Sequence, residues 1–496
     1  MLLQYQKDIL CYYQWVVDTI IRDYRPIILM VNLADEPFGG DYSPYAEVAF
    51  KEKTGLTFRE AQAGGDEEKR ALGAFQSDYI VRYAAWSAEA WHSVCPDIPS
   101  TMSFCGFHAR EENILPSVVG LFADTPPYFH PTFDVYPRDG DQKTAVSEQD
   151  VIMLTLLLRQ MGYLSNKYQK PYWLWTTGNS WGLGQGSADK ANIADAIVNQ
   201  IMAVNMALEN GGLLAGFAVW NYNVKFQGLY NDVYETVYDI EDMLSKLTRV
   251  VGCLRDFARR DLRRASNLAI VADRDYAHTF IAKSHKTTLV RPFAFKRFTY
   301  AAKNNINLFM DERLAEILSF CDARGESYPP ALIYLTSGDR MPSLEEEESL
   351  KRYLSNARYR ALLPRALVEY LRRDAAVAAA MTAYDEMPDS LQEEHLSEFL
   401  QNNGQIPDHL FHFNLGEMEV AYNLTGSARP LALKPEHRNK LVTHLRPFAD
   451  LKEQHPIGTP DADSILLDHH EIAFISGNDS GDLKRIMEAI NTHPDS

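Results

Sequence analysis

Carboxyl groups end two short apolar stretches in the first third of the sequence, where they are placed to act together. Asp35 and Glu36 follow the first stretch, and Asp134 lies at the end of the second. Cleavage of a bond between two sugars needs two carboxyl groups on either side of that bond, one as acid and one as nucleophile or base. Glu36 is the candidate acid, because a like-charged neighbour raises the pKa of a carboxyl group. Asp134 is the candidate second carboxylate.

Aromatic and amide side chains follow the same stretches and two later ones. Sugar rings present C–H bonds that pack on aromatic faces, and their hydroxyl groups pair with amides and carboxylates. The predicted substrate-binding residues are Asp35, Tyr136, Trp175, Thr176, Asn179, Trp181, Trp220 and Asn221. Trp173 shares a strand face with Trp175, because alternate residues of a strand point the same way, but we expect Trp173 to pack in the core.

Each candidate also has an ordinary structural interpretation, which the local sequence leaves open. Glu36 would then be a loop carboxylate that caps the following helix, and Asp134 would hold the fold together by hydrogen bonds. Some of the tryptophans would simply fill the core. A decision between these interpretations depends on the elements that bring the residues together.

Predicted helices alternate with short apolar strands through the first 262 residues, which is the pattern of parallel strand–helix–strand units. The predicted strands lie at 27–31, 98–104, 129–137, 170–178 and 213–223. The predicted helices lie at 1–24, 67–94, 147–168 and 188–210. Polar and aromatic residues end several successive strands, as in a barrel, whereas an open sheet concentrates its site at one switch point. We therefore predict a (β/α)8 TIM-type barrel.

The pattern changes after a basic, polar helix at 254–265. Apolar strands and helices then alternate over 266–400, including a glutamate-rich helix whose start we expect to be solvated, and we predict a smaller α/β domain there. Residues 408–496 alternate apolar and polar side chains, which predicts a small β domain with an inserted helix. The predicted fold class is α/β: a barrel over 1–262, a smaller α/β domain and a C-terminal β-rich domain.

Four motifs in the barrel region resemble clan A glycoside hydrolases, in the order in which that family carries them. VNLADEP (31–37) resembles strand four, whose end bears the acid/base, and TFDVYP (132–137) resembles strand six with its site tyrosine. KPYWLWTTGNSWG (170–182) resembles strand seven, and GFAVWNYN (216–223) resembles strand eight, which ends in a tryptophan that lines the sugar site. The following domain resembles the trimerisation domain of bacterial β-galactosidases. The resemblance implies a glycosidase for β-linked sugars, galactosides among them, with Glu36 as its acid/base.

The sequence departs from that family in two ways. Thr176 and Thr177 stand where the family has a nucleophilic glutamate, and a hydroxyl without an adjacent base is a poor substitute. The first three strands of the barrel have no counterpart, so we expect a barrel that lacks them. Two functions therefore stay open: a retaining or inverting glycosidase, in which Asp134 or another loop supplies the second carboxylate, and a non-catalytic carbohydrate-binding or assembly protein.

The overall composition excludes some partners. A net charge of -18 repels phosphate backbones, so we expect no nucleic acid. No segment is long and apolar enough to span a bilayer, so we expect no membrane partner either. Five scattered cysteines without metal-like spacing favour a reducing, cytoplasmic compartment. The proposed chemistry needs no cofactor, and the resemblance implies a homo-oligomer formed through the second domain.

Overall fold

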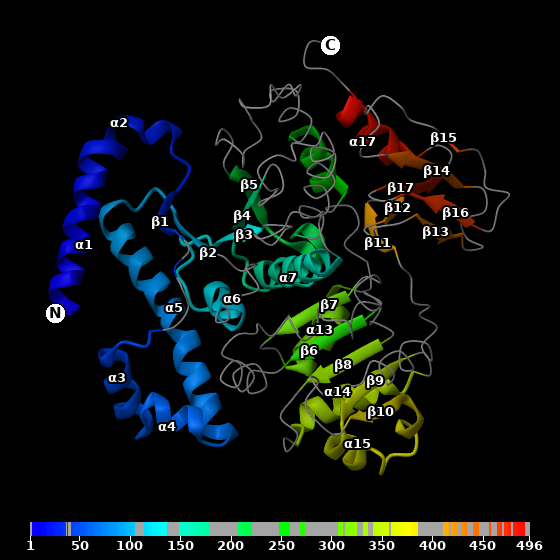
Figure 1. Ribbon diagram of the computed structural model, residues 1–496, viewed down its shortest axis with the longest axis horizontal. Helices are drawn as coiled ribbons and strands as arrows, with labels where there is room; N and C mark the ends of the chain where they lie inside the picture. Colours follow the sequence, from blue (N-terminus) through cyan, green and yellow to red (C-terminus); the bar gives the residue numbers. More distant parts are fainter. Residues whose placement is uncertain are drawn as a thin grey trace.

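A computed structural model shows three successive parts, and in the residues that it describes each part contains a five-stranded β-sheet and at least one helix (Figure 1). The structure describes residues 2–35, 37, 41–104, 114–135, 148–177, 207–220, 248–257, 268–272, 306–310, 313–324, 331–335, 341–356, 359–384, 410–415, 418–423, 428–433, 440–445, 456–457, 464–468, 471–477 and 480–491. No helix within these ranges is both long and apolar enough to cross a membrane.

The first part of the chain alternates helices with parallel strands. Its helices are α1 (Leu2–Val16), the π-helical turn η1 (Val17–Ile21), α2 (Arg22–Tyr24), the 3₁₀ turn η2 (Arg25–Ile27), α3 (Pro44–Thr54), α4 (Phe58–Ala63), α5 (Asp66–Val94), α6 (Ile114–Ala123), α7 (Glu148–Lys167) and the 3₁₀ turn η3 (Glu209–Gly211). Its strands are β1 (Val31–Asp35), β2 (Ser100–Phe104), β3 (Thr132–Val135), β4 (Tyr172–Thr177) and β5 (Leu214–Trp220). These strands form one sheet in the order β1-β2-β3-β4-β5, and every neighbouring pair is parallel.

The position of the first strand corrects the sequence-based prediction. The apolar run at 27–31 predicts the strand, but β1 begins at Val31 and ends at Asp35. Pro26 lies in the 3₁₀ turn η2, and the backbone joins the ladder only where the Val31 N–H donates to the Pro99 carbonyl. Proline fixes its own backbone and lacks an N–H, so the ladder starts later than the apolar residues do. Asp35 is therefore a strand residue and not the first loop residue.

The second sheet has the order β10-β9-β8-β6-β7 and is parallel throughout. Its strands are β6 (Leu268–Ala272), β7 (Ile306–Met310), β8 (Ala331–Leu335), β9 (Arg360–Pro364) and β10 (Met381–Tyr384). Its helices are α13 (Leu314–Arg324), α14 (Leu344–Leu354), α15 (Arg365–Leu371) and the 3₁₀ turn η4 (Ala378–Ala380). The glutamate-rich start of α14 is only partly solvated, because Glu346 is buried in a capping box with Ser343.

The third part is antiparallel and ends in a helix. One sheet has the order β11-β12-β17-β14-β15, and β13 pairs with β16 beside it. The strands are β11 (Phe411–Leu415), β12 (Met418–Tyr422), β13 (Arg429–Ala432), β14 (Lys440–Leu445), β15 (Pro456–Ile457), β16 (Ser464–Leu467) and β17 (Ile472–Gly477). The helix α17 (Gly481–Asn491) follows the last strand, where the sequence suggested a helix inserted between strands.

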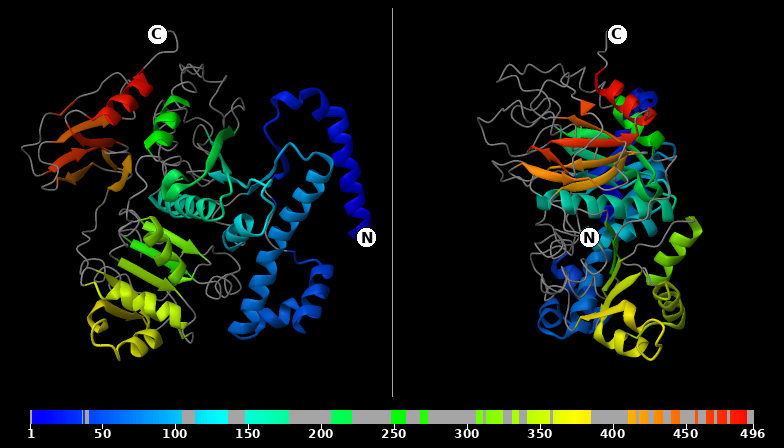
Figure 2. Two further views of the ribbon diagram at one scale, coloured as in Figure 1. Left: turned by 180° about the vertical axis from the view of Figure 1, so that it is seen from behind. Right: turned by 90° about the vertical axis from the view of Figure 1, so that its right-hand side faces the viewer.

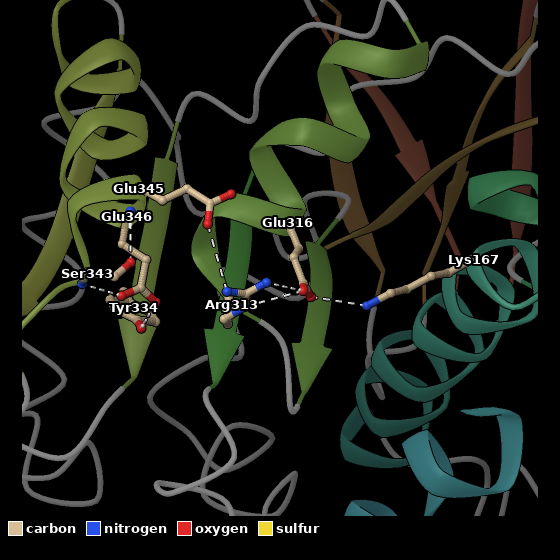
Figure 3. A network of polar contacts seen from close by, with 7 residues as sticks. All are labelled: Lys167, Arg313, Glu316, Tyr334, Ser343, Glu345 and Glu346. Carbon is tan, nitrogen blue, oxygen red and sulfur yellow. Dashed lines mark hydrogen bonds and ion pairs between the residues drawn. The ribbon is translucent and has the colours of Figure 1, made fainter. Parts of the chain in front are cut away.

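Helix α7 lies between the first sheet and the second in both face-on views (Figures 1 and 2). Tyr163 on α7 packs edge-on against Phe309 of β7, with ring centroids 4.9 Å apart. Lys167 at the end of α7 pairs with Glu316 of α13, with 3.2 Å between Nζ and Oε2 (Figure 3). Helix α17 contacts the helical residues 248–257 of the first part, where Arg485 pairs with Asp256 at 2.6 Å. The first sheet is thus held against both later parts.

Candidate functional site

The two faces of the first sheet differ sharply in composition. One face packs against helices and joins the main apolar core through fully buried side chains, namely Met102, Phe104, Phe133, Tyr172 and Leu174. The alternate residues of the same strands are polar or aromatic: Asn32, Thr101, Ser103, Thr132, Trp173 and Trp175. Because strand residues alternate between faces, this second set shares the face that is turned away from the core. We call it the polar face.

Hydrogen bonds join the polar face across three strands. The Asn32 side-chain amide of β1 donates to the Ser103 hydroxyl of β2 over 3.0 Å. The hydroxyl oxygens of Thr101 and Thr132 lie 2.6 Å apart and link β2 to β3. Ser103, Thr101 and Thr132 are fully buried, whereas Asn32 is exposed. These residues tie β1, β2 and β3 together on the polar face, and sequence reasoning missed them. The signal that could have found them is the polar residue at every second position of an otherwise apolar strand.

Two indole rings continue the polar face on β4. Trp173 and Trp175 are both half-buried, and Trp173 belongs to none of the apolar clusters, although the sequence predicted it in the core. Gly216 of β5 is the register partner of Trp173. A Cβ atom at Gly216 would lie 2.3 Å from Cζ3 of the Trp173 ring, so the absence of a side chain there makes room for the indole.

The carboxyl ends of the strands bring the sequence candidates to one edge. The backbone register sets Asp134 of β3 opposite Trp175 of β4, and Thr177 of β4 opposite Trp220 of β5. Thr176 is the register partner of Val135 and of Val219. Parallel strands end at the same edge, and this edge carries the active site in barrel enzymes. The backbone therefore brings Asp134, Trp175, Thr176 and Trp220 near one edge of the sheet, and their roles in binding or catalysis stay predictions.

A bulge at the end of β1 sets the position of Asp35. Asn32 pairs with Thr101 and Asp35 pairs with Ser103, so three steps along β1 match two steps along β2. An extra residue in one strand bends that strand and redirects the side chains beyond it. Asp35 is exposed at this bulge, beside the fully buried Ser103. Glu36 follows directly in the sequence.

The backbone at Asp41, six residues after the end of β1, is hydrogen-bonded to helix α5. The buried Gln76 side chain accepts from the Asp41 N–H at 2.7 Å and donates to the Asp41 carbonyl at 3.1 Å. The Asp41 carboxylate in turn accepts from the Ser43 N–H, and Ser43 caps α3. Gln76 thus holds the backbone at Asp41 against α5. Because 35 residues separate Gln76 from Asp41, no local pattern identifies this contact.

Five predicted site residues lie outside the described residues: Glu36, Tyr136, Asn179, Trp181 and Asn221. For Asp134, Thr176 and Trp220 the structure describes the backbone position on a strand. Asp35 and Trp175 are described in full. Within the described ranges, no three histidine, cysteine, aspartate or glutamate side chains come together as a metal site would require.

The opposite end of the sheet carries a buried cation. Lys170, just before β4, donates from Nζ to the Thr125 carbonyl and the Thr125 hydroxyl, both at 2.6 Å, at the end of α6. Burial lowers the pKa of Lys170 from 10.5 to about 8, although Asp124 nearby favours the charged form. Burial also lowers the pKa of His130, and the Lys170 charge adds to that shift. These groups hold the base of the sheet and lie far along the strands from its carboxyl edge.

Comparison with solved structures identifies the fold. A β-galactosidase from the psychrophilic Marinomonas ef1 matches 96% of this chain and 83% of its own length, with a TM-score of 0.59 and 10% identity. A GH42 β-galactosidase from G. stearothermophilus matches 95% of this chain and 81% of its own, with a TM-score of 0.55 and 12% identity. The chain shares the fold of the GH42 β-galactosidases.

A third neighbour widens the range of substrates found on this fold. The GH42 exo-carrageenase of Bacteroides ovatus matches 89% of this chain and 66% of its own, with a TM-score of 0.53 and 10% identity. No protein-family model and no curated protein matches the sequence. The α/β fold class predicted from the sequence is confirmed, and so is the resemblance to clan A glycoside hydrolases at the level of the fold. The domain boundaries stay a prediction.

Proposed function

We propose that this protein binds a neutral saccharide at the carboxyl edge of the first sheet and hydrolyses its glycosidic bond. The observation that supports this most is the polar face, where indoles and small hydroxyl side chains lead to a strand edge that also carries Asp134. The fold that this chain shares with GH42 β-galactosidases supports the proposal. Fold likeness alone does not assign an activity, so the proposal depends on the residues.

Glu36 is the proposed acid and Asp134 the proposed second carboxylate. Glu36 follows β1 and Asp134 belongs to β3, with β2 between them. Neighbouring strands lie roughly 4.8 Å apart, so about 10 Å separates β1 from β3. Side chains that reach toward each other over such a distance can hold the two carboxyl groups at the separations that retaining or inverting glycosidases need. Glu36 would protonate the departing oxygen, and Asp134 would attack the sugar or activate a water.

The replacement of Glu36 by glutamine tests the assignment. Glu36→Gln keeps the size of the side chain but removes the proton that the leaving oxygen receives. We expect lactose hydrolysis to fall by about 10²–10⁴-fold. Hydrolysis of a nitrophenyl β-galactoside should fall less, because nitrophenolate leaves without needing a proton. Rates are measured as kcat/KM, and thermal unfolding verifies the fold.

Glu52→Gln on the exposed side of α3 is the matched control and should keep full activity. If Glu36→Gln hydrolyses both substrates at the rate of the parent protein, Glu36 has no part in the mechanism. An equal loss on both substrates would instead give Glu36 a role other than proton donor.

The hydroxyl pair on β4 favours a second candidate, saccharide binding without cleavage. Thr176 and Thr177 occupy the end of β4, where the resemblance implies a nucleophilic glutamate. A threonine hydroxyl offers no negative charge to an oxocarbenium-like transition state. This candidate predicts that galactose or lactose binds in calorimetry while no monosaccharide is released above an enzyme-free control. Released galactose that disappears with Asp134→Asn would exclude it.

A further inference from the structure

The indole N–H of Trp173 is a buried donor that lacks an acceptor among the residues that the structure describes. The Nε1 atom is covered, and within this part of the chain it makes no hydrogen bond. Tryptophan N–H groups that are buried almost always find a partner, because a donor shielded from water without one costs free energy. The ring as a whole is half-buried and lies on the polar face. A donor in such a place points to an oxygen atom that arrives with a ligand.

Gly216 determines which way the ring is turned. The three ring atoms nearest to the virtual Cβ of Gly216 are Cζ3, Cε3 and Cη2, at 2.3, 2.8 and 3.1 Å. All three belong to the six-membered ring, on the side of the indole that is remote from Nε1. The six-membered ring of the indole therefore lies against β5 at Gly216, and Nε1 is not among the ring atoms nearest to that glycine. Thr132 of β3 is the register partner on the other side of Trp173.

The surroundings restrict the chemistry of the ligand. Thr101 and Thr132 already pair with each other, and Ser103 accepts from Asn32, so these neighbouring hydroxyls are uncharged and already hydrogen-bonded. No lysine or arginine belongs to the polar face within the described strands, which disfavours an anion. An N–H donor cannot hold a metal cation. A neutral molecule with C–H faces and hydroxyl oxygens suits the site.

We propose that Trp173 is a saccharide-binding residue whose N–H donates to a sugar hydroxyl oxygen, beside Trp175 and with the space for its ring provided by Gly216. This inference rests on the proposed saccharide function and adds a deeper contact to it. Trp175 lies two residues closer to the carboxyl edge on the same strand face, so the two indoles follow each other along the polar face. Trp173 therefore contributes to selection of the sugar and takes no part in proton transfer.

Trp173→Phe removes the N–H and keeps an aromatic ring. We expect the Kd for galactose and for lactose, measured by titration calorimetry, to rise about five- to tenfold, as the loss of one hydrogen bond predicts. Gly216→Ala places a methyl group against the ring and should raise the same Kd. Tyr172→Phe is the matched control: its hydroxyl donates to the Ala207 carbonyl on the opposite face at 2.7 Å, so its removal should leave the Kd unchanged.

Indole N–H signals in a ¹⁵N spectrum separate binding from packing. The signal missing in Trp173→Phe identifies Trp173, and we expect that signal to shift when galactose is added to the parent protein. An unmoved signal together with an unchanged Kd in Trp173→Phe, while the parent protein binds galactose, would overturn the inference and leave the proposed function standing. Absence of galactose and lactose binding by the parent protein would overturn the proposed function and this inference with it.

Discussion

The first and second sheets are both parallel and both have five strands, yet they bury their faces differently. In β8 of the second sheet, four consecutive residues from Ala331 to Tyr334 are apolar and buried. In β2 of the first sheet, Thr101 and Ser103 alternate with Met102 and Phe104. A parallel sheet covered on both faces reads as a continuous apolar run. The second sheet therefore has two core faces, whereas the first keeps one face for polar contacts.

The strand orders lead to the same contrast. The first sheet adds each new strand on the same side, from β1 to β5, so the strand ends follow the chain along one edge. The second sheet has the order β10-β9-β8-β6-β7. Here β7 is added on one side of β6, and β8 and the later strands are added on its other side. A sheet of that second kind concentrates its ligand site where the chain switches sides in this way, whereas a barrel uses many strand ends. A site built from several strands therefore fits the first sheet better than the second.

The largest effect should come from the core of the second sheet. Leu332 of β8 is fully buried between β6 and β9. Leu332→Ala should lower the free energy of unfolding by about 2–5 kcal/mol, through lost burial and the cavity left behind. Chemical denaturation measures that loss, and calorimetry with galactose should show unchanged affinity. A loss of affinity in a variant that is still folded would show that the second sheet contributes to the saccharide site, and the contrast between the sheets would fail.

Local pattern predicted the elements better than it predicted the contacts between them. Helices α5 and α7 begin and end within a residue or two of the prediction, because their apolar periodicity is long and uninterrupted. Strand β1 was predicted four residues too early. The residues after Pro26 are apolar like a strand, but Pro26 lies in a 3₁₀ turn and the strand begins only at Val31. The pairing of Gln76 with Asp41 depends on the fold as a whole. Residues far apart in the sequence carry no local mark of such a contact.

For the candidate site, too, the sequence predicted positions along the strands but not contacts between strands. The strand-end positions of Asp134, Trp175 and Trp220 follow from the alternation of strands and helices, which any parallel sheet imposes. The position of Trp173 outside the apolar clusters did not follow, because tryptophan in an apolar strand resembles a core residue until the neighbouring strand is known. Gly216 decides the outcome, and it lies 43 positions away on β5, where no local rule relates it to that ring.

An intermediate effect should appear as a pH dependence at the base of the first sheet. The pKa of Lys170 is about 8 in the folded protein against 10.5 ordinarily. Between these two values the unfolded chain holds a proton that the folded protein has released, so this group makes the free energy of unfolding increase as the pH rises from about 8 to 10.5. Below pH 8 both states carry the proton, and the dependence on this group vanishes.

Replacement of Lys170 by methionine should remove that increase. Denaturation curves at pH 7.5 and pH 10 are compared for the parent protein and Lys170→Met, because the difference between the two proteins cancels other titrating groups. Lys53→Met, on an exposed turn of α3, serves as the control and should follow the parent protein. Identical pH dependence in the parent protein and Lys170→Met would show that Lys170 keeps an ordinary pKa.

The smallest effect should come from the ion pairs that join the two sheets. Glu316 accepts from Lys167 of α7 at 3.2 Å and from Arg313 at 2.8 Å, and the side chains of Lys167 and Glu316 are 27% and 36% exposed (Figure 3). Exposed pairs contribute only about 0.2–1 kcal/mol, because water screens both charges. The buried contact between Tyr163 and Phe309 carries more of the attachment.

A double-mutant cycle of Lys167→Ala and Glu316→Ala isolates the pair between the sheets. The coupling free energy should be about 0.2–1 kcal/mol at low salt and should decline toward zero in 1 M salt, where charges are screened within roughly 3 Å. Arg313 stays in place throughout, so its own contact with Glu316 cancels between the two arms of the cycle. A coupling well above 1 kcal/mol, or one that salt leaves unchanged, would mean that the pair is buried in solution. The two sheets would then behave as one rigid unit. The saccharide site would depend on both of them, and the second sheet could not be treated as purely structural.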